Sequence, residues 1–301
     1  MKITAKSIRE QKSSGKPITC LTAYDFPTAA LLDEIGIDIV LVGDSLGTVL
    51  LGYDSTCPVT MRDMLHHTKA VSRAVKNSLV VSDMPFGSYE SSPEKAIRNA
   101  QRLIKEGGAS SVKLEGGKPM AKTVAALVQK GIPVMGHVGL TPQSAELLGG
   151  YKVQGQTSEE AERILEDARA LDEAGAFAVV LECIPADLAK RITDEISVPT
   201  IGIGAGPHSD GQVLVIHDLL GLLNGTRPRF VRAYADLRSS MREAVNQFKT
   251  DVLTRNFPAT KESYGSPSLR GAPIGATKQS RSEIASLARN DSDRQKRIST
   301  E

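Results

Sequence analysis

Four short apolar runs in this sequence end in or beside an acidic residue, and no other feature limits the possible fold as strongly. The acids are Asp44, Asp83, Glu115 and Glu182, and each follows a run rich in β-branched residues. Short runs of this kind, bounded by Gly and Pro, are typical of strands buried on both faces of a parallel sheet. Acids at the ends of four such strands predict carboxylates that meet at one edge of the sheet.

Helix and strand signals alternate along most of the chain. Strands are expected at residues 18–23, 133–138, 199–203 and 213–216, and in the four runs that end at Asp44, Asp83, Glu115 and Glu182. Helices are expected at residues 7–13, 27–35, 60–75, 92–105, 120–130, 158–174, 186–196 and 230–253. Eight strand–helix units in about 250 residues predict an α/β fold, a (β/α)8 TIM barrel.

The barrel is expected to form one catalytic domain over residues 1–257, with the helix at 7–13 covering one of its ends. The connection from Leu46 to Pro58 is long for a strand-to-helix loop, and long loops in compact domains are usually functional. From residue 258 to 301, Ser, Gly, Arg, Lys and Asp dominate and large apolar residues are few. This composition predicts a disordered tail.

Composition and charge argue against several classes of protein. Hydrophobic residues make up 40% of the chain and Trp is absent, which predicts a sizeable aliphatic core. The tail from Lys261 carries a charge of about +3, so the net charge of +2 leaves a nearly neutral barrel without a basic surface for nucleic acid. Cys20, Cys57 and Cys183 are scattered, as expected for reduced cytoplasmic thiols rather than disulfides or a zinc site. We expect neither a signal peptide nor a membrane span.

Three of the acids end neighbouring strands of the predicted barrel. Because the carboxyl ends of all strands in a (β/α)8 barrel share one face, Asp44, Asp83 and Glu115 are expected to meet there. Their oxygens suit a hard divalent cation such as Mg²⁺, and without a counter-ion they would repel one another. The alternative is that each acid caps a loop or pairs with Lys or Arg. For the adjacent set the sequence favours a metal site.

Lys113 and Ser45 are candidates for binding a substrate carboxylate. Lys113 precedes Glu115 by two residues, so both side chains point to the same side of a strand. A lysine there could anchor an anion or form a structural ion pair with one of the acids. Ser45 follows Asp44 directly, where it could bind the same anion or simply form a turn.

Glu182 and His137 lie at the ends of later strands. Glu182, beside Leu181 and Cys183, is a candidate general base, with a partly buried Glu–Arg pair as the alternative. His137 could ligate a metal or donate to a substrate, but the sequence favours a supporting polar role. The adjacent His66 and His67 are expected on a helix surface, and residues 202–206 are expected to form a tight turn.

Six motifs give the sequence a family resemblance. They span residues 22–25, 42–47, 82–89, 112–117, 136–143 and 202–206, and read TAYD, VGDSLG, SDMPFGSY, VKLEGG, GHVGLTPQ and GIGAG. In this order, over about residues 3 to 254, the chain resembles the ketopantoate hydroxymethyltransferase family. That resemblance implies a barrel of the phosphoenolpyruvate/pyruvate superfamily type.

The resemblance also implies roles and partners. Asp44, Asp83 and Glu115 match the family's Mg²⁺ ligands, Ser45, Asp83 and Lys113 match its keto-acid contacts, and Glu182 matches its proton acceptor. Asp44 is expected to belong to the substrate-binding set as well as to the Mg²⁺ ligands. The substrates implied are 3-methyl-2-oxobutanoate and 5,10-methylenetetrahydrofolate, and the assembly implied is a homo-oligomer, commonly a decamer.

Two other functions remain as alternatives at this point. One is a Mg²⁺-dependent carbon–carbon or carbon–phosphorus lyase acting on an oxo acid with the same barrel. Such lyases usually carry a loop with a cysteine after a mid-barrel strand, and this sequence has no obvious counterpart. The other is a non-catalytic barrel that serves as a binding module, in which the acids would have structural roles only.

Overall fold

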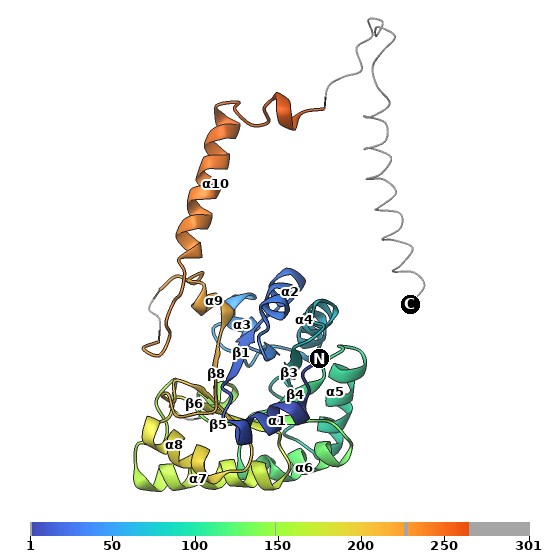
Figure 1. Cartoon of the computed structure of the whole chain (residues 1–301), viewed down its shortest axis with the longest axis vertical. Coiled ribbons are helices and arrows are strands. Elements are labelled where there is room, and N and C mark those ends of the chain that lie inside the picture. Colours follow the sequence, from blue (N-terminus) through green and yellow to red (C-terminus); the bar gives the residue numbers. More distant parts are fainter. Residues whose placement is uncertain (1, 148, 226–227, 265–301) are drawn as a thin grey trace, which may run out of the picture. The chain divides into compact units, whose positions relative to one another are not determined.

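The computed structural model describes residues 2–147, 149–225 and 228–264. Eight parallel strands close into a barrel in sequence order, with β8 paired to β1 (Figure 1). The strands are β1 (Ile18–Thr22), β2 (Ile39–Val42), β3 (Leu79–Asp83), β4 (Ser111–Lys113), β5 (Val134–Gly139), β6 (Ala178–Glu182), β7 (Thr200–Ile203) and β8 (Gly211–Leu214). The predicted (β/α)8 barrel is therefore confirmed.

The helices follow the strands as expected from their capping residues. They are α1 (Ala5–Ser14), α2 (Phe26–Ile35), α3 (Leu46–Val49), α4 (Met61–Ala74), α5 (Pro93–Lys105), α6 (Ala121–Gln129), α7 (Ser158–Glu173), α8 (Ala186–Glu195), α9 (Ile216–Leu219) and α10 (Leu237–Leu253), with short 3-10 turns η1 (Lys118–Met120), η2 (Pro142–Ser144) and η3 (Thr260–Glu262). Thr60 forms a reciprocal capping box with Asp63 at the start of α4, and Ser92 caps α5 ahead of Pro93.

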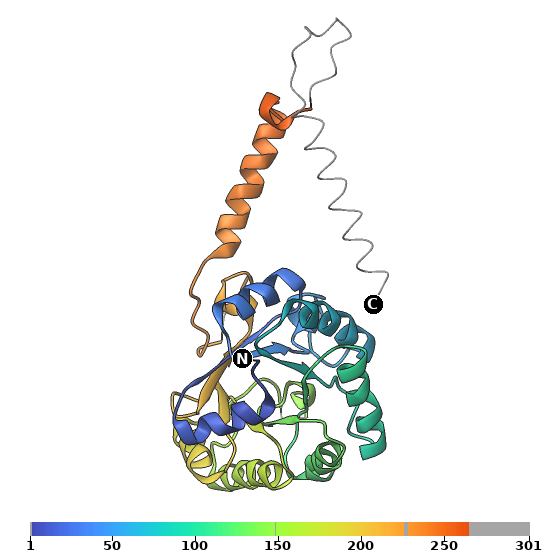
Figure 2. The same ribbon diagram turned by 45° about the vertical axis from the view of Figure 1, so that its right-hand side comes forward.

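The core has two parts, one inside the barrel and one between the strands and the surrounding helices. Alternate strand residues face inward, for example Ile39 and Leu41 on β2. Ile8 of α1 is fully buried and belongs to the inner cluster, so α1 covers the end of the barrel where the strands begin (Figure 2). This confirms the prediction of a helix that covers one end.

Several element boundaries differ from the prediction. β2 and β4 end at Val42 and Lys113, so Asp44 and Glu115 lie two residues beyond their strands. β8 begins earlier than expected, at Gly211, because a close pairing with Ile18 of β1 compensates for the low strand propensity of glycine. The predicted loop from Leu46 contains the short helix α3.

The last predicted helix begins at Leu237 and not near residue 230. The backbone N–H groups of Tyr234 and Leu237 donate to the carbonyls of Leu219 and Leu220, at 2.8 and 3.0 Å. These bonds hold the preceding segment against the end of α9 in a non-helical path. Periodicity of apolar residues could not reveal this long-range pairing.

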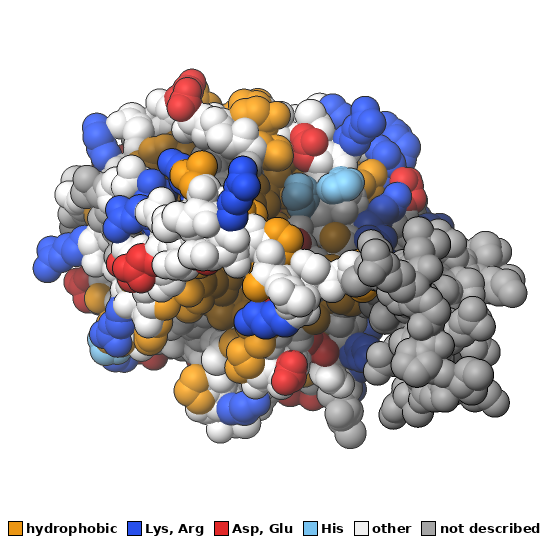
Figure 3. All heavy atoms as spheres, turned by 90° about the horizontal axis from the view of Figure 1, so that it is seen from above, with side chains coloured by type: hydrophobic (Ala, Val, Ile, Leu, Met, Phe, Trp, Pro, Cys, Tyr) orange, Lys and Arg blue, Asp and Glu red, His pale blue; other side chains and the backbone are white. Residues whose placement is uncertain are grey.

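The chain divides into two compact units, residues 1–241 and 242–301. The described part of the second unit contains the C-terminal portion of α10 and the turn η3. Most of the predicted tail at 258–301 lies outside the described residues, and the predicted division after residue 257 stays a prediction. No helix in the described ranges is long and apolar enough to cross a membrane. Figure 3 shows Lys and Arg side chains scattered among acidic and apolar ones on one face.

Candidate active site

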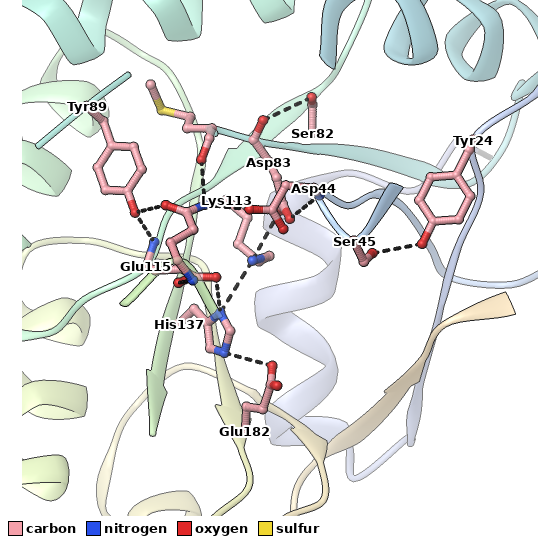
Figure 4. Close-up of polar contacts among 12 residues, drawn as sticks. Tyr24, Asp44, Ser45, Ser82, Asp83, Tyr89, Lys113, Glu115, His137 and Glu182 are labelled. Carbon is pink, nitrogen blue, oxygen red and sulfur yellow. Dashed lines mark hydrogen bonds and ion pairs between the residues drawn. The ribbon is translucent and has the colours of Figure 1, made fainter. Parts of the chain in front are cut away.

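The strand ends of the barrel bring the predicted site residues together (Figure 4). Asp83 ends β3 and Lys113 ends β4, while Asp44 and Glu115 follow β2 and β4 by two residues. All four side chains are buried, with at most 5% of each residue exposed. Glu182 ends β6 on the other side of the group. The predicted convergence of these residues at one mouth is therefore found.

Lys113 is the buried cation of this group. Asp83 and Lys113 are register partners on β3 and β4, and Lys113 Nζ lies 3.2 Å from Asp83 Oδ1. Burial acts to lower the pKa of Lys113, but the carboxylates of Asp83, Glu115 and Asp44 outweigh it and raise that pKa. The lysine is therefore charged at neutral pH, and of the two predicted roles the structure shows the ion pair.

The carboxylates outnumber the fixed positive charge. Asp83 Oδ2 accepts the backbone N–H of Asp44 at 3.0 Å. Burial, followed by the charges of Asp83 and Glu115, raises the pKa of Asp44 well above its ordinary value. Burial also raises the pKa of Asp83, against the opposing effects of Lys113 and of the Asp44 N–H. The mouth thus has an excess of negative charge that a further cation would neutralise.

The donor set fits a hard cation that also binds substrate oxygens. No group of three or more His, Cys, Asp or Glu in the described part of the chain is already arranged as a metal cage. Mg²⁺, however, usually takes only one or two carboxylates and completes its shell with water and substrate oxygens. Asp83 Oδ1 is fully buried and has no hydrogen-bond partner besides its ion pair with Lys113. The assignment of Asp44, Asp83 and Glu115 as ligands stays a prediction.

His137 lies at the centre of the site, between two carboxylates. Its Nδ1 is 3.5 Å from Glu115 Oε1 and 3.4 Å from Lys113 Nζ, and its Nε2 is 3.2 Å from Glu182 Oε2. The last contact is an ion pair by distance but lies outside hydrogen-bond geometry. Burial and Lys113 act to lower the pKa of His137, but Glu115 and Glu182 raise it to about 9. The sequence favoured a supporting polar role for His137, and in the structure its ring nitrogens contact both Glu115 and Glu182.

Glu182 is the most accessible carboxylate of the group, with 16% of its side chain exposed. Its partner is His137, and not the arginine that sequence reasoning offered as the alternative. A partly open carboxylate held by an imidazolium can reach a bound molecule and accept a proton from it. The base role of Glu182 stays a prediction.

Ser45 lies beside the acids, and its Oγ is 2.8 Å from Tyr24 Oη. A Cβ at Gly43 would stand 2.8 Å from Ser45 Oγ and 3.6 Å from Asp83 Oδ2, so both side chains lie close to this glycine. The Ser45 hydroxyl makes no capping bond to the short helix α3. Its predicted contact with a substrate anion stays a prediction.

Sequence reasoning did not single out Tyr24, Tyr89 and Gln143, which contact the site residues directly. Tyr89 Oη donates to Gln143 Oε1 at 2.7 Å, and Gln143 Nε2 donates to Asp44 Oδ2 at 2.8 Å. All three lie in motifs that carry the family resemblance. Their membership of these motifs, in the connections that follow β1, β3 and β5, was the available signal.

Three minor predictions concern the histidine pair, residues 202–206 and the cysteines. His66 is exposed as expected, but His67 is half-buried and its Nδ1 lies 2.7 Å from the Tyr24 carbonyl, so the surface prediction is wrong for His67. In the segment predicted as a tight turn, Gly202 and Ile203 are the end of β7 and the chain bends at residues 204–205, with Gly204 and Gly206 at φ of 64° and 76°. The three cysteines are free thiols, as predicted.

Comparison with known proteins gives matches over nearly the whole barrel. The family model described as ketopantoate hydroxymethyltransferase matches residues 2–260. The 3-methyl-2-oxobutanoate hydroxymethyltransferase of Thermoanaerobacter sp. (strain X514) is 58% identical over 263 residues, which cover 87% of this chain and 96% of that protein.

Solved structures share the fold at much lower identity. Phosphonopyruvate hydrolase in complex with oxalate and Mg²⁺ has a TM-score of 0.57 at 14% identity, covering 86% of this chain and 93% of that chain. 2,3-dimethylmalate lyase, a member of the PEP mutase/isocitrate lyase superfamily, has a TM-score of 0.55 at 17% identity, covering 84% and 86%. These matches show the fold alone, and it is the barrel type predicted above.

Proposed function

Because the chain belongs to the ketopantoate hydroxymethyltransferase family, we propose that it transfers a hydroxymethyl group from 5,10-methylenetetrahydrofolate to 3-methyl-2-oxobutanoate. The product is 2-dehydropantoate, a precursor in pantothenate and coenzyme A biosynthesis. One observation carries the proposal: a partly open carboxylate, Glu182, faces three buried acids and a charged lysine across His137.

The keto acid binds at this mouth through its carboxylate. Lys113 is held charged by the acids around it and supplies a fixed positive charge. The Ser45 hydroxyl, in contact with Tyr24, supplies a hydrogen bond to the same anion. With Asp44 and Asp83 they make up the proposed substrate-binding set. Since the site is buried, its electrostatic interactions are stronger than they would be in water.

Asp44, Asp83 and Glu115 would hold a divalent cation, which we take to be Mg²⁺. When bound, the cation supplies Lewis-acid polarisation of the substrate's keto oxygen. The raised pKa of Asp44 reflects its burial first and then the repulsion from Asp83 and Glu115, which a bound cation would relieve. The related phosphonopyruvate hydrolase was solved with Mg²⁺ and oxalate, a small anion with the same pair of adjacent oxygens.

Glu182 takes the proton from C3 of the keto acid, next to the carbonyl. The electron pair left on C3 attacks the methylene carbon of 5,10-methylenetetrahydrofolate; as the C–C bond forms, one of the two C–N bonds of that carbon breaks and the freed nitrogen takes up a proton. Water then displaces the remaining folate nitrogen, which also takes up a proton, and this leaves the hydroxymethyl group and free tetrahydrofolate. His137, whose Nε2 lies 3.2 Å from Glu182 Oε2, holds the carboxylate of Glu182 in place.

Exchange of the C3 hydrogen tests the base directly. We expect Glu182→Gln to abolish deuterium uptake at C3 in D2O, while the variant still binds the keto acid. Glu173→Gln, an exposed position on α7, is the matched control and keeps normal exchange. Persistent exchange in Glu182→Gln would remove Glu182 from the role of base.

A coupled assay tests the overall reaction. We expect hydroxymethyl transfer to require 3-methyl-2-oxobutanoate, 5,10-methylenetetrahydrofolate and Mg²⁺ together. Cleavage of a 2-methylisocitrate-like substrate, without hydroxymethyl transfer, would instead favour the lyase alternative. The predicted homo-oligomer, a decamer, is part of the proposal and is measured by sedimentation velocity. The predicted cytoplasmic location is checked by cell fractionation.

A further inference from the structure

Two buried side chains outside the proposed ligand sets connect the acids to one another. Gln143 and Tyr89 are only 5% and 2% exposed. The side chain of Gln143 donates from Nε2 to Asp44 Oδ2 at 2.8 Å, and its backbone N–H donates to Glu115 Oε2 at 3.0 Å. A single residue in the turn η2 therefore fixes one oxygen of each acid.

Neighbouring groups determine the orientation of the Gln143 amide. Its Nε2 also donates to the Met84 carbonyl at 3.0 Å, so both acceptors lie on one side. On the other side, Tyr89 Oη accepts the Glu115 N–H at 3.2 Å and donates its own proton to Gln143 Oε1 at 2.7 Å. Rotating the amide by half a turn would place its oxygen against two acceptors and lose these bonds.

The strands alone do not set the separation of these two acids. Asp44 and Glu115 each lie two residues beyond the end of their strand. The N–H groups of Leu114 and Gly116 still donate to the Met135 and His137 carbonyls, at 3.2 and 3.0 Å, so this backbone is held beside β5. The side chains of Asp44 and Glu115 come from different connections, after β2 and after β4. The distance between their oxygens therefore depends on contacts across the mouth, and Gln143 contacts both.

We propose that Gln143, oriented by Tyr89, is a positioning residue that sets the separation of the Asp44 and Glu115 carboxylates and thereby the affinity of the mouth for a divalent cation. This inference rests on the proposed function, since it takes the two acids as cation ligands. Hydrogen bonds that orient ligating carboxylates typically change metal affinity by about 10- to 100-fold when they are removed.

The experiment measures Mn²⁺ binding to the full chain, with free Mn²⁺ followed by electron paramagnetic resonance in the absence of substrates. We expect Gln143→Met to weaken binding by about 10- to 100-fold. This variant keeps the side-chain length and the backbone N–H to Glu115, but it loses the side-chain amide that donates to Asp44 and Met84. Tyr89→Phe frees the amide to rotate and gives a smaller loss. Gln154→Met is the matched control, because the Gln154 amide donates to the Lys152 carbonyl, and it leaves the affinity unchanged.

The possible results separate this inference from the proposed function. Unchanged Mn²⁺ affinity in both Gln143→Met and Tyr89→Phe, with a lower unfolding temperature, would show a merely structural role and overturn the inference alone. No stoichiometric Mn²⁺ binding by the unsubstituted protein would overturn the proposed cation site as well. If Gln143→Met does not fold, the Tyr89→Phe variant tests the positioning role instead. We expect its Mn²⁺ affinity to be reduced and its transfer rate to recover at saturating Mn²⁺. An unreduced Mn²⁺ affinity in Tyr89→Phe contradicts the positioning role.

Discussion

Buried acids at the two ends of the barrel have pKa values shifted in opposite directions: those of Asp33 and Asp38 are lowered, and those of Asp44 and Asp83 are raised. Where the strands begin, Asp33 accepts backbone N–H bonds from Lys76, Asn77 and Ser78 at 3.0, 2.8 and 2.7 Å. Burial acts to raise the pKa of Asp33, but these bonds outweigh it and the pKa is lowered. Asp38 has a lowered pKa for the same reason, with bonds from Thr19. These acids are stabilised in their charged form.

Where the strands end, only Glu115 is offset in this way: burial acts to raise its pKa, but His137, Lys113 and the Gln143 N–H outweigh it and the pKa is lowered. At Asp44 and Asp83 burial is not offset. Burial, Asp83 and Glu115 together raise the pKa of Asp44 well above its ordinary value. Asp33 and Asp38 each accept several hydrogen bonds, whereas Asp44 and Asp83 share Lys113 and repel one another. Buried acids that lower the stability of the folded state are typical of functional sites. The contrast thus separates Asp33 and Asp38 from Asp44 and Asp83, and it predicts opposite effects of substitution for the two pairs.

The largest expected effect is on activity at the mouth. Asp44→Asn keeps the shape and an acceptor for Gln143 but removes a charge that burial disfavours. We expect transfer activity to fall by about 10³-fold, since a bound cation lowers the activation barrier by several kcal/mol. The unfolding temperature stays the same or rises, because the repulsion is reduced. Steady-state kinetics and calorimetry on the same preparation check both results.

A large loss of stability in Asp44→Asn would contradict this view of the mouth. It would place Asp44 with the structural acids, and the raised pKa would then have no functional meaning. Lys113 keeps Asp83 and Glu115 as partners in this variant, so no buried charge is left unpaired.

At the base the expected effect is on stability. Asp33→Ala removes an acceptor shared by three backbone N–H groups, and we expect a loss of about 3 kcal/mol in the free energy of unfolding. For a domain of this size the unfolding temperature falls by about 10 °C. The kcat and KM of the folded fraction stay unchanged. Chemical denaturation and kinetics below the transition measure the two quantities, and a selective loss of kcat would break the contrast.

The same contrast explains how far sequence could predict this molecule. The barrel was predictable because buried strands and capped helices leave local patterns, and the acids at its mouth because parallel strands all end on one face. Tyr89 and Gln143 were not predictable from spacing, since their partners lie 26 to 99 residues away in the chain. The central place of His137 depends on the same long-range packing. Local patterns locate the ligands, while the hydrogen bonds that orient them arise only in the folded chain.

A smaller effect appears in the pH dependence of stability, measured on the protein with a chelator present. The folded pKa of Asp44 is raised, so the folded state binds more protons than the unfolded one and stability falls as pH rises above about 3.9. Asp33 has a lowered pKa, so its contribution is present above about 3.9 and is lost as pH falls through the folded value.

We therefore expect the two asparagine variants to change opposite limbs of the stability curve. Asp44→Asn flattens the decline toward neutral pH, and Asp33→Asn flattens the loss on the acid side. Adding Mg²⁺ stabilises the unsubstituted protein more as pH rises, because the cation binds the ionised carboxylates. Denaturant titrations between pH 3 and 8 provide the measurement. A wild-type curve for Asp44→Asn would show that the mouth carries no repulsion.

The smallest expected difference compares one hydrogen bond at each end. Tyr24→Phe removes the partner of Ser45 Oγ at the mouth, and Thr19→Val removes the hydroxyl that donates to Asp38 Oδ2 at 2.7 Å at the base. Each bond contributes about 1 kcal/mol, equivalent to about a fivefold change in an equilibrium constant. At the mouth we expect this change mainly in the KM for the keto acid, because a free Ser45 hydroxyl must be reoriented when the substrate carboxylate binds. At the base we expect it in the unfolding free energy, with KM unchanged. Equal effects of the two variants on KM would mean that Ser45 is not held for substrate binding, and that the difference between the two ends concerns charge alone.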